Sequence, residues 1–196
     1  MNSEEETQGL ARRAGEGDAA SFTALYERMG PALYTWVALR LPAPLKGVLG
    51  PEDVLQEVWV RALRSLVRFD PERGGFRRWM IQIAKHTLLD CLRRQRALKL
   101  SPQGGLKQAE FLEEVPDQVT SITRRVARQE IVHIFLERVR ELDEPDQSLL
   151  ILAGLEGLPM SEAAGRVGIS EAAGAKRWQR LRARLAEERW PPGFLD

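Results

Sequence analysis

Apolar side chains recur at intervals of three and four residues along almost the whole chain, and this spacing constrains the fold more than any other feature. Such intervals place side chains on one face of an α-helix, whereas a half-buried β-strand needs an alternation with a period of two. No stretch of the chain shows that alternation. The sequence therefore predicts an all-α protein.

The clearest interruption of the helical pattern runs over residues 100–120. Proline and glycine lie near its start and an acidic group follows, a composition typical of linkers. We therefore expect two small helical domains, residues 1–99 and 121–196, joined by a linker over residues 100–120. Within the linker, the composition of residues 106–114 also suits a short helix.

The N-terminal domain is expected to hold three helical stretches. The first begins after Asp18 and reaches about residue 41, with an interruption at Gly30 and Pro31, because proline breaks the ladder of helical hydrogen bonds. The second covers residues 51–68, and its acidic first turn suits the helix dipole. The third covers residues 76–98. The buried stripes of the second and third helices are expected to be Leu55, Val58, Ala62 and Leu66, and Met80, Ala84, Leu88 and Cys91.

The C-terminal domain is expected to begin with one helix over residues 123–142. A short helix over residues 145–155 follows, and Gly157 ends it. Two further helices come next, and the last of them ends at Pro191 and Pro192, because proline cannot continue a helix.

A helix-turn-helix motif is predicted for these last two helices. In this motif a small residue in the first helix allows close packing, and a glycine four residues later adopts a positive φ in the turn. Ala164 and Gly168 have this spacing. Ile169 follows as an apolar plug, and Ser170 stands where it would cap the helix over residues 171–184. The alternative is a plain helical hairpin with a solvated basic face.

Basic residues gather in two clusters, although the formal net charge is only +1. Phosphate binding depends on clustered Lys and Arg, so the local distribution of charge matters more than its total. One cluster lies within residues 73–96, and the other lies within residues 176–184. Both are candidate nucleic-acid surfaces.

Several other functional classes find no support in the sequence. The single cysteine, Cys91, excludes an internal disulfide, and the two histidines form no recognisable metal-ligand set with it. No run is long and apolar enough to span a membrane, and the acidic start does not resemble an export signal, so we expect a cytoplasmic protein without membrane insertion. No catalytic constellation or phosphate-binding glycine loop is present, so no enzymatic activity, cofactor or metal is expected.

Four segments occur in an order that is much more specific than any one of them. They read GDAASFTALYERMGPALYTWV, PEDVLQEVWVRAL, FRRWMIQIAKHTLLDCLRR and LEGLPMSEAAGRVGIS. Together they resemble the conserved segments of the group IV, or extracytoplasmic-function (ECF), sigma factors of the sigma-70 family, which are subunits of bacterial RNA polymerase. The resemblance covers most of the chain and implies a non-enzymatic subunit that directs core polymerase to specific promoters and helps to open the DNA.

The resemblance also implies protein partners. In the family, the segment that matches EDVLQE docks on a coiled coil of the polymerase clamp. The matching polar residues, expected on the exposed side of their helix, are Asp53, Gln56 and Glu57. An anti-sigma factor that covers both DNA-binding domains is a further implied partner.

The resemblance implies contact with the promoter −10 element through the loop over residues 65–77 and the helix after it. Flipped bases of the non-template strand would lie in pockets and against aromatic or polar groups. The candidate residues are Arg73, Phe76, Arg78, Trp79, Lys85, His86, Arg93 and Arg94.

The helix over residues 171–184 would enter the major groove at the −35 element. Lys176, Gln179 and Arg180 match positions that approach bases, and Arg177 and Arg184 match phosphate contacts. The full set of candidates is Glu171, Lys176, Arg177, Gln179, Arg180 and Arg184.

The chain departs from the family pattern in two places. His86 stands where an asparagine is usual, so the preferred −10 base does not carry over. Residues 172–175 are alanines and Gly174, which leaves few long side chains near the start of the second helix to read bases. Phosphate contact with modest sequence preference is therefore expected at the −35 element.

Two alternatives remain open at this stage. A helix-turn-helix regulator would bind duplex DNA without polymerase, and its N-terminal helices would sense a ligand or partner. A protein-binding helical adaptor would use the basic patches only as solvated surface. DNA binding measured with and without core polymerase separates the regulator from the sigma factor.

Overall fold

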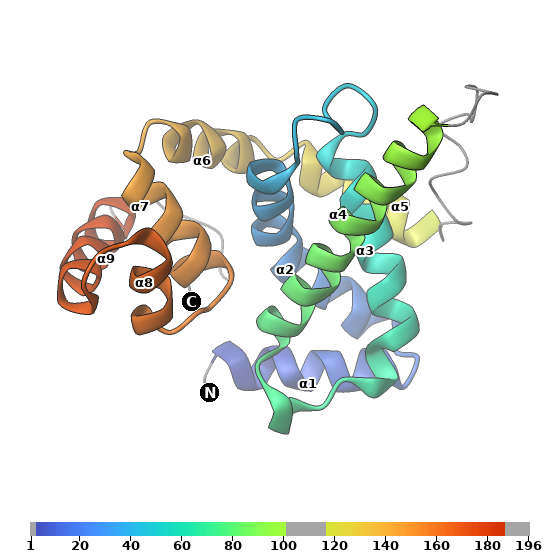
Figure 1. Cartoon of the computed structure of the whole chain (residues 1–196). Helices are drawn as coiled ribbons and strands as arrows, with labels where there is room; N and C mark the ends of the chain where they lie inside the picture. Colours follow the sequence, from blue (N-terminus) through green and yellow to red (C-terminus); the bar gives the residue numbers. More distant parts are fainter. Residues whose placement is uncertain (1–2, 101–116, 187–196) are drawn as a thin grey trace.

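The computed structural model describes residues 3–100 and 117–186, and every regular element in these two ranges is a helix (Figure 1). The prediction of an all-α protein is therefore confirmed. The expected short helix over residues 106–114 and the expected stop at Pro191 and Pro192 lie outside the described residues. None of the described helices is both long enough and apolar enough to cross a membrane.

Over residues 3–100, four α-helices and two short 3₁₀ turns form the N-terminal part. They are α1 (Ser3–Gly15), α2 (Ala19–Arg40), α3 (Pro51–Ser65), η1 (Leu66–Arg68), η2 (Pro71–Arg73) and α4 (Phe76–Leu100). The stripes expected in α3 and α4 are confirmed, since every residue named for them is buried. They meet α2 in one core whose largest side chains include Trp36 and Trp59.

Helix α1 was not predicted from the sequence. The second residue of this helix, Glu4, accepts a hydrogen bond from the backbone N–H of Phe76 at 2.9 Å. A carboxylate at this point satisfies one of the N–H groups that a helix leaves unpaired at its start and suits the positive end of its dipole. Helix α1 therefore helps to fix where α4 begins.

The expected interruption at Gly30 and Pro31 was wrong, because α2 runs unbroken through both residues. A proline inside a helix removes one backbone hydrogen bond and costs about 3 kcal/mol. Here the turn around Pro31 is buried almost completely, and the apolar area it removes from water offsets that cost.

Residues 117–186 of the C-terminal part contain six helical elements. They are α5 (Asp117–Ala127), α6 (Glu130–Arg140), α7 (Glu144–Leu149), η4 (Leu150–Leu155), which is a π-helical segment, α8 (Met160–Val167) and α9 (Glu171–Ala186). The single helix expected over residues 123–142 was wrong, because the chain breaks near Arg128 and Gln129 between α5 and α6. The expected stop at Gly157 is confirmed by its positive φ of 67°.

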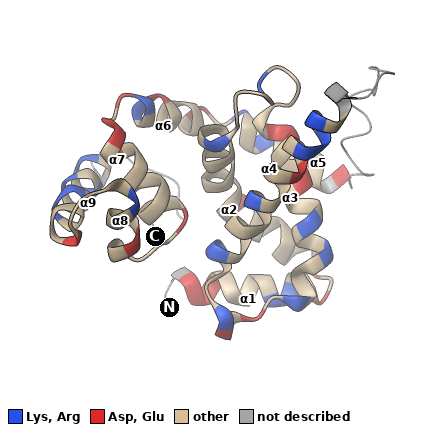
Figure 2. Ribbon diagram, viewed as in Figure 1, with Lys and Arg blue, Asp and Glu red and all other residues tan. Residues whose placement is uncertain are grey.

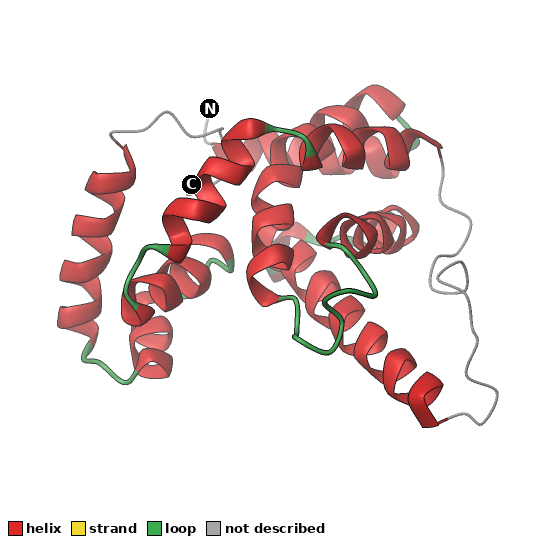
Figure 3. Ribbon diagram, turned by 90° about the horizontal axis from the view of Figure 1, so that it is seen from above, coloured by secondary structure: helices red, strands yellow, loops and turns green. Residues whose placement is uncertain are grey.

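Helix α5 begins at Asp117, within the range expected for the linker, and lies against α2 and α3 (Figures 1 and 3). Val119, Ile122 and Val126 are fully or almost fully buried in the same core as the N-terminal helices. The hydroxyl groups of Thr123 and Tyr26 share a hydrogen bond, and the Tyr26 ring stacks on Trp59 with centroids 4.1 Å apart. The helices that follow α5 are therefore connected to an element that packs firmly on the N-terminal part.

Candidate nucleic-acid interface

The loop before α4 is built around three aromatic rings. Phe69, Phe76 and Trp79 pack with centroid distances of 5.2 to 5.4 Å. Phe76 is fully buried, so its side chain supports the loop from beneath. Phe76 therefore has a packing role, whereas the sequence predicted a contact with DNA. The difference arises because its apolar ring lies between the loop and the core.

A pocket of about 170 Å³ opens over this aromatic cluster. Phe69 and Trp79 line its apolar side, and its polar side holds the exposed Arg73 and Arg78 together with Asp70, which lies 3.3 Å from Arg73. Gly74, with a φ of 144°, lets the loop turn sharply at the pocket edge. An apolar floor with cations at the rim suits a nucleobase attached to a phosphate backbone.

The remaining −10 candidates lie further along α4. His86 and Arg93 are exposed, whereas Lys85 and Arg94 are half-buried. Lys85 donates a hydrogen bond to Glu156 at 2.6 Å, and Arg94 lies 3.5 Å from Glu57. The exposed candidates thus follow one side of α4, where basic residues recur along the ribbon (Figure 2).

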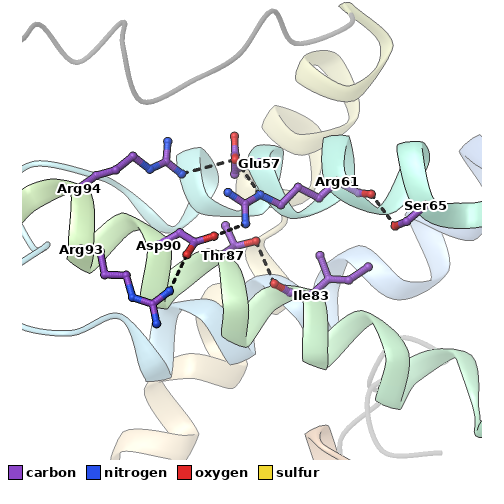
Figure 4. A network of polar contacts seen from close by, with 8 residues as sticks. All are labelled: Glu57, Arg61, Ser65, Ile83, Thr87, Asp90, Arg93 and Arg94. Atoms are coloured by element: carbon purple, nitrogen blue, oxygen red, sulfur yellow. Dashed lines mark hydrogen bonds and ion pairs between the residues drawn. The ribbon is translucent and has the colours of Figure 1, made fainter.

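A network of ion pairs joins α3 to α4 (Figure 4). Arg61 donates to Glu57 at 2.8 Å and to Asp90 at 2.7 Å, and Arg93 donates to Asp90 at 3.1 Å. The hydrogen bond from Arg61, aided by Arg93 and by both positive charges, holds the pKa of Asp90 below its ordinary value. Asp90 is therefore ionised at neutral pH and braces the helix that carries the exposed candidates.

The three polymerase candidates lie at the start of α3. Asp53 is half-buried and accepts a hydrogen bond from the backbone N–H of Gly50 at 2.8 Å, which caps the helix. The expectation that Gln56 and Glu57 are exposed was wrong, since their exposed fractions are 9% and 5%. Helix α3 is enclosed because α4 and α5 both pack against it, and helical spacing alone does not reveal that second neighbour.

The helix-turn-helix geometry is confirmed in its local details. Gly168 has a φ of 80°, and its N–H bonds to the carbonyls of Ala164 and Gly165 at the end of α8. The Ser170 hydroxyl accepts a hydrogen bond from the N–H of Ala173 at 3.3 Å, as expected of a cap.

Gly174 has a role that the sequence analysis missed. A Cβ atom on Gly174 would lie 2.8 Å from Ala164 Cβ and 3.1 Å from Met160 Sδ. Helices α8 and α9 therefore approach each other so closely that only glycine fits at their crossing. Its pairing with the small Ala164 ten residues earlier is the signal that a sequence reading could have used.

Most of the −35 candidates are on the outer surface of α9. The exposed ones are Glu171, Lys176, Gln179, Arg180 and Arg184. Figure 2 shows the Lys and Arg positions along this helix.

Arg177 is different from these residues because it is already paired. Its guanidinium donates to Asp146 at 2.9 Å and to Asp143, both at the start of α7. The N–H of Asp146 and the Arg177 side chain together hold the pKa of Asp143 below its ordinary value. Arg177 thus braces α9 against α7 in this structure.

Comparisons with known proteins agree with this geometry. The model of the family "Sigma-70 region 2" matches residues 25–98. The chain is 30% identical to the RNA polymerase sigma factor NccH of Alcaligenes xylosoxydans xylosoxydans over 180 residues, which cover 91% of each chain. It is also 30% identical to the RNA polymerase sigma factor CnrH of Cupriavidus metallidurans, with 95% of each chain covered. The chain belongs to the ECF sigma factors of the sigma-70 family.

This sigma factor directs RNA polymerase to promoters for the initiation of transcription, and it is a non-enzymatic subunit like the rest of its family. The family model spans α3, the loop and most of α4, so it includes the pocket over Phe69 and Trp79. A solved structure of CnrH in complex with the cytosolic domain of CnrY matches over 93% of this chain and 96% of that chain, at 27% identity and a TM-score of 0.42.

Proposed function

We propose that this sigma factor recognises the −10 element with the pocket before α4 and the exposed side of α4. The observation that carries the proposal is the 170 Å³ pocket, whose aromatic floor is bordered by Arg73 and Arg78. A flipped base would stack on Trp79, and the two arginines would hold the adjoining phosphates. His86 and Arg93 would contact the strand further along the helix.

The −35 element is assigned to α9. Lys176, Gln179 and Arg180 are exposed on one helix surface next to a capped N-terminus, which is the geometry of a helix that enters the major groove. The small residues before Lys176 leave most of the binding energy to phosphate contacts, so affinity should fall steeply with salt. Arg184 is a phosphate contact in this scheme, and Arg177 contributes by holding α9 in place.

Core polymerase is assigned to the start of α3. Asp53 is the accessible member of the three candidates, whereas Gln56 and Glu57 become available only if the elements packed around α3 move. The protein then acts in the cytoplasm, where polymerase and DNA lie. An anti-sigma protein that covers α4 and α9 together is the regulatory partner that the family resemblance implies.

The domain division is also a proposal. Residues 1–99 act on polymerase and the −10 element, residues 121–196 act on the −35 element, and residues 100–120 join them. By packing, α5 and α6 lie against the N-terminal helices, so within residues 121–196 the proposed −35 contacts are made by the helix-turn-helix of α8 and α9.

In vitro transcription from a library of randomised promoters with core polymerase tests the −10 assignment. His86→Asn should change which −10 sequences are used, because it replaces an exposed side chain on α4 about one turn beyond Gln82, which lines the pocket. The control is His133→Asn, the same substitution on the exposed side of α6, which should leave the selected promoters unchanged. Identical promoter sets for wild type and His86→Asn would contradict the assignment.

Arg180→Ala in the same assay tests the −35 assignment. We expect weaker transcription from promoters that depend on the −35 element, with little change in the −10 sequences selected. Tight, sequence-specific binding of duplex DNA by the free protein would instead favour a regulator that works without polymerase.

A further inference from the structure

Glu156 is a carboxylate buried between the two parts of the molecule. It directly follows the π-helical segment η4, and its residue is only 2% exposed. Its Oε1 accepts hydrogen bonds from Trp36 Nε1 at 3.0 Å and from Arg40 Nη2 at 3.1 Å. Its Oε2 accepts one from Lys85 Nζ at 2.6 Å. All three donors belong to the N-terminal part, 71 to 120 residues away along the chain.

Glu156 keeps its charge in this position. Burial by itself would raise its pKa, but the hydrogen bonds from Lys85 and Trp36 and the charges of Lys85 and Arg40 outweigh that effect, so the pKa lies below its ordinary value. A buried carboxylate that stays ionised needs such a set of donors, because an unpaired charge away from water is strongly unfavourable.

Trp36, Arg40 and Lys85 form an anion seat, by which we mean a set of donors that converge on one point. The set presents two cations and one indole N–H and no acceptor, so it suits any anion with two oxygens side by side. A carboxylate and a phosphodiester share this chemistry. The side chains of Arg40 and Lys85 are 42% and 31% exposed even with Glu156 in place, so the seat opens toward solvent.

The seat lies next to residues that we assign to the −10 strand. Lys85 is one turn or less from the exposed His86 and Gln82 on α4, and Trp36 and Arg40 come from the last turns of α2. The neighbouring Arg77 donates a hydrogen bond to the carbonyl of Gly154 at 2.9 Å, so η4 is held by a second basic residue of α4.

The contact around Glu156 is incompletely packed. A pocket of about 380 Å³ adjoins the seat, lined among others by Leu88, Leu89, Leu92 and Arg166. Apolar side chains that do not close on one another contribute little to holding two surfaces together. The polar contacts of Glu156 therefore matter for the closed arrangement at this point, and a competing anion can weaken it.

We propose that Glu156 occupies a seat for a backbone phosphate of promoter DNA, and that this internal occupant lowers the affinity of the free protein for the −10 strand. The proposal rests on the −10 assignment above. Displacement of Glu156 by a phosphate exchanges one anion for another on Trp36, Arg40 and Lys85. DNA binding and release of η4 are then coupled, because the seat holds one anion at a time.

The test compares full-length wild type with Glu156→Gln, which is nearly isosteric and uncharged. The probe is a short fluorescent single-stranded DNA pool of random sequence, titrated without polymerase. If the seat of the free protein is open about one tenth of the time, Glu156→Gln should bind the pool about tenfold more tightly. The control is Glu137→Gln, which removes the same charge from a side chain that is 73% exposed on α6 and should bind like wild type.

Two further measurements distinguish the release of Glu156 from the seat from a general effect of the lost charge on DNA binding. The double variant Glu156→Gln with Lys85→Gln should lose most of the gain, because it removes a cation that would hold the phosphate. Small-angle scattering should give a larger radius of gyration for Glu156→Gln than for wild type. If Glu156→Gln does not fold, Glu156→Asp keeps the charge but shortens its reach, and an intermediate gain in affinity is expected.

Equal affinities of wild type, Glu156→Gln and Glu137→Gln would overturn the proposal, as would a gain that the double variant retains. A wrong −10 assignment would give a different experimental result. In that case neither wild type nor Glu156→Gln would bind the −10 strand even with core polymerase, whereas failure of the internal occupant alone leaves polymerase-dependent binding intact.

Discussion

At the scale of single residues, Gly174 shows how a position that weakens a helix can be required by its surroundings. Glycine costs about 1 kcal/mol relative to alanine inside a helix. Yet a Cβ at this position would lie 2.8 Å from Ala164 Cβ, well inside van der Waals contact. The close crossing of α8 and α9 therefore outweighs the local preference for alanine.

We expect Gly174→Ala to destabilise the protein. Overpacking of a tight contact costs about 1–3 kcal/mol, of which the better helix propensity returns about 1 kcal/mol. The matched control is Gly165→Ala in α8, where nothing lies within 4 Å of the added Cβ, and which should be neutral or stabilising. Urea unfolding followed by circular dichroism measures both, and a stabilised Gly174→Ala would contradict the close approach.

Arg177 and Arg180 are three residues apart on α9, and their substitution by alanine should have different effects on stability and DNA binding. Arg177 is bound to Asp143 and Asp146, whereas Arg180 is exposed. We expect Arg177→Ala to lower the midpoint of thermal unfolding and, through the misplaced helix, the affinity for −35 duplex DNA. Arg180→Ala should lower the affinity alone. Equal thermal midpoints for the two variants would show that the ion pairs with α7 do not brace the helix.

At the scale of elements, α5 belongs by packing to the N-terminal helices. Its apolar stripe, Val119, Ile122 and Val126, is buried, and Val126 Cγ2 would lie 3.0 Å from a Cβ added to Gly30 on α2. A helix that buries a full stripe contributes several kcal/mol through the apolar area it removes from water. The surface of α2 and α3 that α5 covers is apolar, and it is removed from water together with the stripe of α5.

We therefore expect a fragment of residues 1–128 to be more stable than a fragment of residues 1–100. The shorter fragment exposes the surface around Tyr26 and Trp59 that α5 covers. The measurement is thermal unfolding together with binding of a dye specific for exposed apolar surface. Ile122→Asp in the longer fragment should reproduce the behaviour of the shorter one, whereas Ser121→Asp, on an exposed neighbour, should not.

At the scale of the whole molecule, the contact between the two parts should depend on pH through Glu156. Its folded pKa lies below the ordinary value, so its contribution to stability is present above the ordinary carboxyl pKa of about 4.3 and is lost as the pH falls through the lower folded pKa. The charged groups that face Glu156 are Lys85 and Arg40, with Arg166 across the adjoining pocket.

The expected result is a difference in urea midpoint between wild type and Glu156→Gln that is constant from neutral pH to about pH 5 and shrinks below about pH 4. Glu137→Gln, whose side chain is exposed, serves as the reference for general acid effects. A difference that grows as the pH falls would mean that Glu156 is protonated in the folded state at neutral pH.

Much of the fold could be predicted from the sequence because it depends on local spacing. The stripes of α3 and α4, the positive φ of Gly168 and the cap at Ser170 each involve residues within a few positions of one another. The candidate residues at the −10 loop and on α9 likewise came from motifs that are contiguous in the chain. Continuity of α2 through Pro31 could not be predicted in this way, because it depends on what packs around the proline.

By itself the sequence determined an all-helical chain with a helix-turn-helix and the family resemblance, since helical period, turn chemistry and motif order are all read along the chain. The tertiary structure alone decided that α5 covers α3, that Gln56 and Glu57 are buried, and that Glu156 lies on Trp36, Arg40 and Lys85. These contacts join residues up to 120 positions apart. Their energies depend on burial and on which charges meet, and neither quantity exists until the chain has folded.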